Sequence, residues 1–220
     1  MKKILLLLYI YYSMLTLSWA DGIIIPMPPR ADMPQQIALP VDYHYVQVAI
    51  KDQLASTSID QAFINPYSYD LEGTYLFPLP EDSAISEFSL FSDGKKLTGE
   101  VLDKDEARKI YEDIVRRMKD PGLLEYVGKN LFKCRVYPIP GQKKKQLGLR
   151  YEEVLKKEGN VARYTYPLDI EKYTGSPIRD VEINVQIESK TPIKSVYSPS
   201  HKIEVKREGE GKVTVIYKDE

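Results

Sequence analysis

The sequence has 220 residues, which permits one large β domain or two small ones and is long enough to bury a substantial core. Its formal net charge is −1 at pH 7, so no global positive field favours nucleic acid or anionic lipid as a partner. Tyrosine is common, at 17 residues, which is typical of β-rich proteins with half-exposed aromatic faces.

Residues 1–20 have the organisation of a secretory signal peptide. Lys2 and Lys3 form a positive start, Ile4–Leu17 is apolar, and Ser18–Ala20 is a small-residue cleavage site. The apolar run is shorter than the roughly 20 residues of a membrane-spanning helix, which favours cleavage over an uncleaved anchor. We therefore expect export to the periplasm, the cell surface or the medium, with membrane contact only through this segment if it stays uncleaved.

The stretch 21–40 contains five prolines and little periodicity, which is typical of an extended tether. Within it, Ile23–Ile25 is a candidate edge strand. The single cysteine, Cys134, excludes an internal disulfide, so the fold has to rest on its core. Cys134 alternates with Phe132 and Val136 on one strand face, which favours a buried apolar residue over a reactive thiol.

Short strands are predicted along the rest of the chain. Val46, Val48 and Ile50 alternate with polar and aromatic residues, with the period of a half-buried strand. Asp93-Gly94 is a hairpin signal, and a second hairpin is expected around residues 138–145. The expected strands are Val41–Asp52, Ala55–Pro66, Gly73–Pro78, Ile85–Ser92, Lys95–Leu102, Leu131–Tyr137, Gln146–Val154, Val161–Leu168, Val181–Ser189, Ile193–Tyr197, Lys202–Lys206 and Lys212–Lys218.

One amphipathic helix is predicted at residues 103–119. Asp103 is a suitable N-cap, with Glu106 as the acidic half of a capping box, and Asp120-Pro121-Gly122 ends the helix. Such a helix cannot bury its apolar stripe alone, so we expect it to lie on a sheet. Helical spacing is shown by Ala107, Ile110, Tyr111, Ile114, Val115 and Met118.

These elements predict a mainly β fold, namely an antiparallel β-sandwich with the helix at 103–119 packed on the sheet and a small C-terminal β extension. The expected division is a signal peptide at 1–20, a proline-rich tether at 21–40, a β domain at 41–170, and an extension or connector toward a further domain at 171–220.

The residues provide no recognisable catalytic, cofactor-binding or metal-ligating set. His44 and His201 stand far apart, without cysteine or carboxylate neighbours at ligand spacing. Glu112-Asp113 and Glu152-Glu153 are adjacent carboxylates whose side chains diverge, so neither pair is a ready acid/base dyad. Asp103–Asp105 lacks the glycine and glutamate of a calcium loop. No nucleophile elbow or phosphate-binding glycine loop is present either.

Lys143–Lys145 is the one basic run. It is interpreted either as a solvated hairpin tip that discourages edge pairing or as a polyanion-binding tip.

Several long motifs, in one order, closely resemble the VIT domain (vault protein and inter-alpha-trypsin inhibitor heavy chain), especially its bacterial secreted members. The resemblance covers about Val41–Tyr217. The motifs are Asp60–Pro66 (DQAFINP), Leu71–Pro80 (LEGTYLFPLP), Ala107–Glu112 (ARKIYE), Phe132–Pro140 (FKCRVYPIP) and Leu147–Tyr151 (LGLRY).

The resemblance implies a β-rich interaction or scaffolding module without an established catalytic set, so no site residue is carried over. Such domains usually precede a von Willebrand factor A domain, whose D-x-S-x-S motif is absent here. We therefore expect an exported, non-catalytic module of the cell envelope or extracellular space that binds proteins. A von Willebrand factor A domain, in cis or in trans, is one candidate partner; nucleic acid and small-molecule cofactors are not expected. The alternatives are a carbohydrate or polyanion binder and an extracytoplasmic hydrolase.

Overall fold

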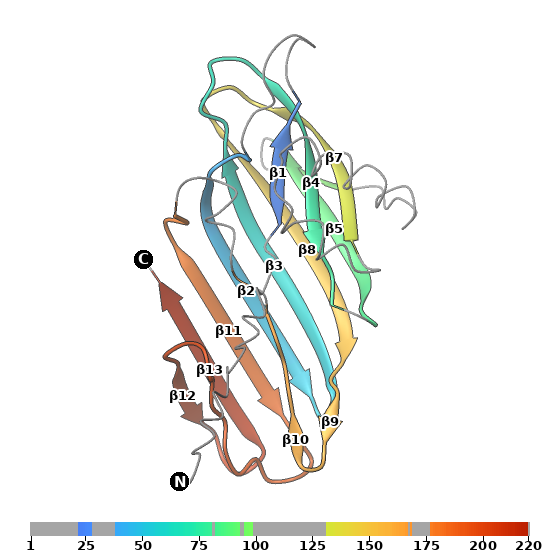
Figure 1. Ribbon diagram of the computed structural model, residues 1–220, viewed down its shortest axis with the longest axis vertical. Coiled ribbons are helices and arrows are strands. Elements are labelled where there is room, and N and C mark those ends of the chain that lie inside the picture. Colours follow the sequence, from blue (N-terminus) through green and yellow to red (C-terminus); the bar gives the residue numbers. More distant parts are fainter. Residues whose placement is uncertain are drawn as a thin grey trace, which may run out of the picture.

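The computed structural model describes residues 22–27, 38–80, 82–92, 95–98, 131–166, 168 and 177–219. Within these ranges the chain forms strands joined by turns and loops, and no helix. A broad sheet of eight strands carries a smaller sheet of three strands on one face (Figure 1). The core lies between these two layers.

The main sheet has the strand order β12-β13-β11-β2-β3-β8-β5-β6. Neighbouring strands run antiparallel, except that β11 runs parallel to β2. The strands are β2 (Val41–Lys51), β3 (Leu54–Ile64), β5 (Ala84–Ser92), β6 (Lys95–Thr98), β8 (Lys144–Val154), β11 (Val181–Glu188), β12 (Glu204–Arg207) and β13 (Lys212–Asp219).

The small sheet has the order β1-β4-β7, with all pairs antiparallel. It consists of β1 (Ile23–Pro26), β4 (Leu71–Pro78) and β7 (Leu131–Ile139), and β9 (Lys157–Glu158) and β10 (Val161–Ala162) form a separate short hairpin. We call the face of the main sheet that is turned toward the small sheet the inner face, and the opposite face the open face.

Aromatic rings fill the space between the two sheets. Tyr75 of β4 packs edge-on against Phe63 of β3, with ring centroids 6.1 Å apart. Phe88 of β5 and Phe132 of β7 pack edge-on at 4.8 Å. All four rings are buried. Full burial of one such side chain stabilises the fold by about 1.5–3 kcal/mol, so this cluster holds the two sheets together.

Most strand predictions are confirmed. Val46, Val48 and Ile50 are buried on the inner face, and Gln47 and Ala49 are exposed between them. The candidate edge strand in the proline-rich stretch is also present, as β1. Two predictions are wrong in extent: the expected strand at Val161–Leu168 is limited to β10, and the expected strand at Ile193–Tyr197 is not formed.

The predicted fold class, an antiparallel sandwich with a helix packed on the sheet and a small C-terminal extension, is wrong, although the chain does form two packed β layers. The strands β11 and β13 complete the main sheet, and β11 pairs with β2 in parallel over eight positions from Val181↔His44 to Glu188↔Lys51. The described residues contain no helix, and the helix predicted at 103–119 lies outside them. Alternation marks a strand but does not specify its partner or direction, which is why the parallel pair was missed.

The predicted hairpin around residues 138–145 is also wrong. β7 pairs with β4 in the small sheet, whereas β8 pairs with β3 and β5 in the main sheet. The chain between them therefore crosses from one layer to the other. The division of the chain at residues 20, 40 and 170 stays a prediction.

Candidate functional site

A line of buried and half-buried polar side chains runs along the inner face of the main sheet and reaches the small sheet. We call it the polar seam: His44 on β2, Thr57 and Gln61 on β3, Tyr75 on β4, and Tyr151 and Glu153 on β8. Residues 163–166, which we call the strap, cross this face after β10 (Figure 1). Two strap tyrosines, Tyr164 and Tyr166, contact the seam.

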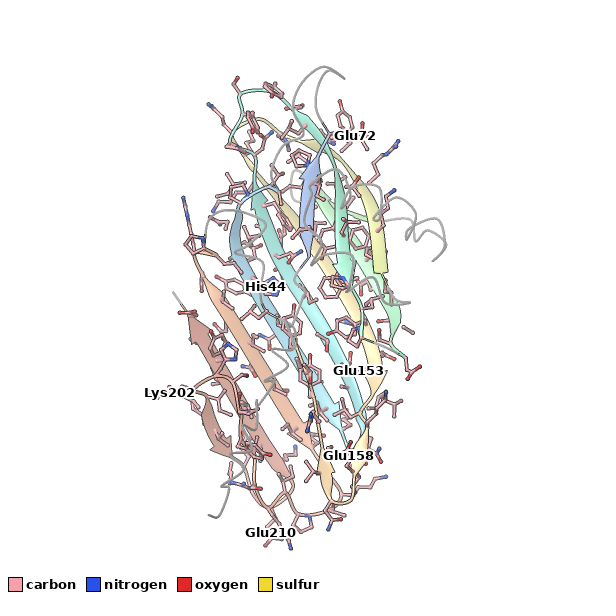
Figure 2. The ribbon with its side chains drawn as sticks, viewed as in Figure 1. His44, Glu72, Glu153, Glu158, Lys202 and Glu210 are labelled. Carbon is pink, nitrogen blue, oxygen red and sulfur yellow. The ribbon has the colours of Figure 1, made fainter. Side chains whose placement is uncertain are left out.

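His44 is at the centre of the first half of the polar seam. It is fully buried in the middle of the main sheet (Figure 2). Its Nδ1 lies 2.8 Å from Gln61 Oε1, and its Nε2 lies 2.7 Å from the Tyr166 hydroxyl. The Gln61 amide donates to the Tyr75 hydroxyl at 2.8 Å. Because the Gln61 amide nitrogen donates to Tyr75, Gln61 Oε1 is the atom that accepts from the His44 Nδ1–H.

The second half of the polar seam lies around Thr57. Its hydroxyl lies 2.9 Å from the Tyr164 hydroxyl. Tyr151, directly opposite Thr57 in the register, is fully buried, and its hydroxyl makes no hydrogen bond of normal geometry with a described residue. Burial raises the pKa of Tyr151 well above its ordinary value, and burial likewise raises the pKa of Tyr164. Both phenols are therefore neutral hydrogen-bonding groups.

Glu153 lies at the end of the polar seam, half-buried. Its Oε1 is buried without a hydrogen-bond partner among the described residues, and burial raises the pKa of its carboxyl. Glu152 points to the opposite face and is exposed, as the divergence of adjacent strand residues predicts. The polar seam thus joins the strap to the sheet through side-chain hydrogen bonds, in an arrangement that fits structural support.

The open face of the main sheet carries a second polar cluster. The Tyr43 hydroxyl donates to Asp60 at 3.1 Å, and the Gln146 amide donates to the same carboxylate at 2.9 Å. The Tyr45 hydroxyl donates to Asp180, and that hydrogen bond is the main cause that raises the Tyr45 pKa to about 12. The Tyr43 and Tyr45 rings stack at 4.6 Å.

Two loops at one end of the sandwich are joined by Asn65, a buried residue of the DQAFINP motif. Its amide donates to the carbonyls of Tyr69 and Ile139, each at 2.9 Å, and its Oδ1 accepts from Tyr67 N–H at 3.0 Å. Gly141 approaches so closely that a Cβ there would lie 2.7 Å from the Ser68 backbone. This contact accounts for the glycine between Pro140 and Gln142.

The residues singled out from the sequence do not converge on one site. His201 is exposed and packs edge-on against Tyr217, whereas His44 belongs to the polar seam. Cys134 is buried, as its alternation predicted. Glu112-Asp113 and Asp103–Asp105 lie outside the described residues.

The interpretation of Lys143–Lys145 as a solvated tip is wrong for its last residue. Lys145 is the first of the alternate β8 residues that face inward, and it is buried, with 2% of its surface exposed. Lys144 binds Asp42 at 2.5 Å, and Lys143 is exposed. In the described part of the chain, no group of three or more histidine, cysteine, aspartate or glutamate side chains could hold a metal ion. The same part contains no helix of the length and apolarity needed to cross a membrane.

Sequence reasoning missed most of the polar seam. The available signal was the alternation along each strand. His44 falls at the same alternate positions as the buried Val46 and Val48, and Gln61 falls at the same alternate positions as the buried Ile59. A polar residue in the buried phase of a strand needs a partner, because an unpaired buried polar group is costly.

Comparison with known proteins identifies the family. Residues 41–151 match the family described as "Vault protein inter-alpha-trypsin domain". The chain belongs to the VIT domain family. The match includes the motifs that contain Gln61, Asn65 and Tyr75, and it ends in β8, so β11, β12 and β13 lie beyond the matched stretch of this VIT protein.

Relatives of this VIT protein include two long curated proteins. The human von Willebrand factor A domain-containing protein 5A is 32% identical over 154 residues, which are 67% of this chain and 19% of that protein. Inter-alpha-trypsin inhibitor heavy chain H2 of Sus scrofa is 29% identical over 148 residues, 66% of this chain and 15% of that protein. The chain therefore spans less than a fifth of either relative.

Similarity to a solved structure supports the fold of this protein only. A candidate nutrient-binding protein from Legionella pneumophila superposes with a TM-score of 0.51 at 12% identity, covering 88% of this chain and 65% of that one.

Proposed function

We propose that this VIT domain is an exported, non-catalytic module that binds or organises other proteins at the cell envelope or outside the cell. The observation that carries the proposal is the contrast between the two faces of the main sheet. On the inner face, His44 binds Gln61, and His44 and Thr57 bind the strap tyrosines, whereas the open face presents a broad surface of mixed charge to solvent.

The ion pairs of the open face are suited to exchange for contacts with a partner. Lys218 and Glu182 pair at 2.9 Å, and Arg150 and Glu87 lie 4.0 Å apart. Exposed pairs of this kind contribute little to stability, so a partner displaces them at small cost. A surface with both signs of charge gives specificity through electrostatic complementarity. A von Willebrand factor A domain, in cis or in trans, is the partner that the name of the human relative supports.

Export rests on the charge, apolarity and cleavage-site pattern of residues 1–20. The stretch at 21–40, which includes β1, then joins that segment to the rest of the β domain, to which β11, β12 and β13 also belong. N-terminal sequencing of the protein from its native host should find Asp21 first. A mature chain that begins at Met1 would contradict export by cleavage.

Photo-crosslinking in the native host tests the binding surface. A photoreactive phenylalanine analogue at Gln47 or Gln186, both exposed on the open face, should give adducts of defined mass with an envelope or extracellular protein. The same analogue at Asn160, in the exposed β9–β10 turn, is the matched control. Equal adduct yields at all three positions, or none at any, would overturn the proposal.

A carbohydrate-binding function is favoured by one observation, the Tyr43–Tyr45 stack beside Asp60 on the open face. Aromatic rings next to carboxylates are suited to stack on and hydrogen-bond to sugars. Screening the protein on a glycan array, with Tyr45→Ala as the comparison, separates the two functions. A glycan signal that the substitution abolishes would favour the carbohydrate binder over the protein-binding module.

A further inference from the structure

The strand β12 forms one edge of the main sheet. It has β13 on one side, and no described strand pairs with its other side (Figure 1). All four of its residues are exposed, including the apolar Val205, with 39% of its surface accessible. An edge strand of this kind presents backbone N–H and C=O groups that another strand can pair with.

The ladder between β12 and β13 determines which backbone groups face outward. Glu208 N–H donates to Lys212 O at 2.9 Å, so Glu208 and Lys212 are a hydrogen-bonded pair. Such pairs alternate along an antiparallel ladder, so Lys206 and Glu204 also bond to β13. The N–H and C=O groups of Val205 and Arg207 therefore point away from β13, toward the free edge.

The side chains on the open face of this strand alternate in charge. Glu204 and Lys206 lie on this face of β12, and Lys202 and Glu208 follow at the same two-residue spacing on either side of it. The order of the charges inverts about Val205. Figure 2 places Lys202 beside this margin of the sheet. When such a segment meets a second copy of itself in antiparallel orientation, positive residues face negative ones.

We propose that two copies of this chain join edge to edge through β12, antiparallel, with Val205 on the two-fold axis. Val205 then exchanges backbone hydrogen bonds with Val205 of the second copy. Glu204 lies opposite Lys206 of the second copy, and Lys202 lies opposite its Glu208. Each pair occurs twice because a two-fold interface is self-complementary.

The charges select this register over its neighbours. Only every second residue of β12 directs its backbone N–H and C=O groups outward, because the residues between them direct theirs to β13. The register between the two copies can therefore shift only in steps of two residues. Centring the axis on Lys206 places two lysines opposite each other and sets Glu204 against Glu208. Centring it on Glu204 places two glutamates opposite each other. Like charges directly opposite are destabilising, so the register centred on Val205 is the favoured one.

A four-residue edge forms a small contact, so the dimer is reversible. Its ion pairs are exposed to solvent, which makes it weaker at high salt. The inference does not depend on the proposed function, because it rests on the sheet edge alone.

Sedimentation velocity of the full chain, expressed with its own N-terminal segment, tests the dimer over a range of protein and salt concentrations. The chain should dimerise at high concentration and dissociate when salt is raised. Glu204→Lys and Lys206→Glu each replace two attractive pairs by two repulsive ones, so each should raise the dimer dissociation constant at least about tenfold.

Mixing the two variants is the decisive measurement. A Glu204→Lys chain carries lysine at both positions and a Lys206→Glu chain carries glutamate at both, so an equal mixture should form mixed dimers with all pairs attractive. Glu152→Lys, on the exposed face of β8 away from this edge, is the control for charge reversal and should leave dimerisation unchanged. Thermal melts of each variant check that it folds.

Loss of dimer in each single variant with recovery in the mixture supports the proposal. A chain that stays monomeric at every concentration overturns it and leaves the edge to a strand of another protein. A dimer that neither substitution weakens overturns the assignment to β12. A mixture that does not recover the dimer overturns the register.

Discussion

The His44 ring and the Gln61 carboxamide lie directly opposite each other on β2 and β3, with Nδ1 and Oε1 2.8 Å apart and both side chains fully buried. Each side chain provides a hydrogen-bond partner for the other at a position that is not accessible to solvent. The pair also extends to both neighbours of the sheet: Gln61 binds Tyr75 of the small sheet, and His44 binds Tyr166 of the strap. It therefore links three separate parts of the chain.

Replacing Gln61 by leucine should lower the free energy of unfolding by about 1–3 kcal/mol, because a buried His44 nitrogen loses its partner. Replacing both residues, as His44→Phe with Gln61→Leu, should cost less than the sum of the two single changes, because the His44–Gln61 hydrogen bond is lost only once and neither member of the pair is left facing an absent partner. Urea unfolding of the three variants measures the difference. Strict additivity would contradict the direct coupling; Ser58→Ala, on the open face of β3, is the control.

The strap should loosen when its tyrosine hydroxyls are removed. Tyr166→Phe deletes one oxygen and its bond to His44, while Tyr164→Phe deletes the contact with Thr57. Both changes should speed tryptic cleavage after the exposed Arg163, because local opening precedes proteolysis. Mass spectrometry of the fragments measures the rate of cleavage of the peptide bond after Arg163. Cleavage after the exposed Lys157 of β9 is the internal control. Unchanged cleavage after Arg163 in both variants would show that the hydroxyls do not hold the strap.

Glu153 should make the stability of the domain depend on pH. Burial raises the pKa of its carboxyl above the ordinary value of 4.5, so the folded chain binds this proton more readily than the unfolded chain. The resulting stability is fully present below the ordinary pKa and is lost as pH rises through the raised pKa of the folded state. Glu153→Gln should therefore be more stable than the unchanged chain at neutral pH.

The difference should shrink toward zero as the pH falls below 4.5. Denaturant melts across this range measure it, and Glu152→Gln makes the same chemical change on the exposed face as a control. A Glu153→Gln variant that is less stable than the unchanged chain at neutral pH would contradict the assigned direction.

Asn65 should be the residue on which the loops at the end of the sandwich depend most. Asn65→Ala leaves the buried carbonyl of Ile139 without its donor, so the free energy of unfolding should fall by at least about 2 kcal/mol. Asn65→Asp should be more damaging, because it removes the donors and adds a buried charge. Thermal melts measure both, with the exposed Ser68→Ala as the control. A silent Asn65→Ala would show that the loops are held by other contacts.

The sequence predicted the strands well because alternation is a local property. Val46, Val48 and Ile50 identify β2 without knowledge of its neighbours, and Phe132, Cys134 and Val136 identify one face of β7. The partners of these strands are not local. Nothing in the alternation of β7 distinguishes β4 from β8 as its neighbour, so the expected hairpin was wrong.

The seam was harder to predict for a related reason. His44 reads as a strand residue, and its role depends on Tyr166, which approaches only because the strap crosses the inner face. The distance along the chain between these two residues is 122 positions. The local pattern indicates that His44 faces inward, and only the tertiary fold determines its partner.

The parallel pairing of β11 with β2 has a consequence for the order of folding. The strands it joins are far apart: Tyr45 and Asp180, which bind each other at one end of the pair, are separated by 135 residues. During synthesis from the N-terminus, β2 is complete long before β11 leaves the ribosome. Contacts of such long range close late and slowly. The edge of β2 therefore stays uncovered while most of the chain is made, so the chain stays incompletely folded until its last strands have emerged.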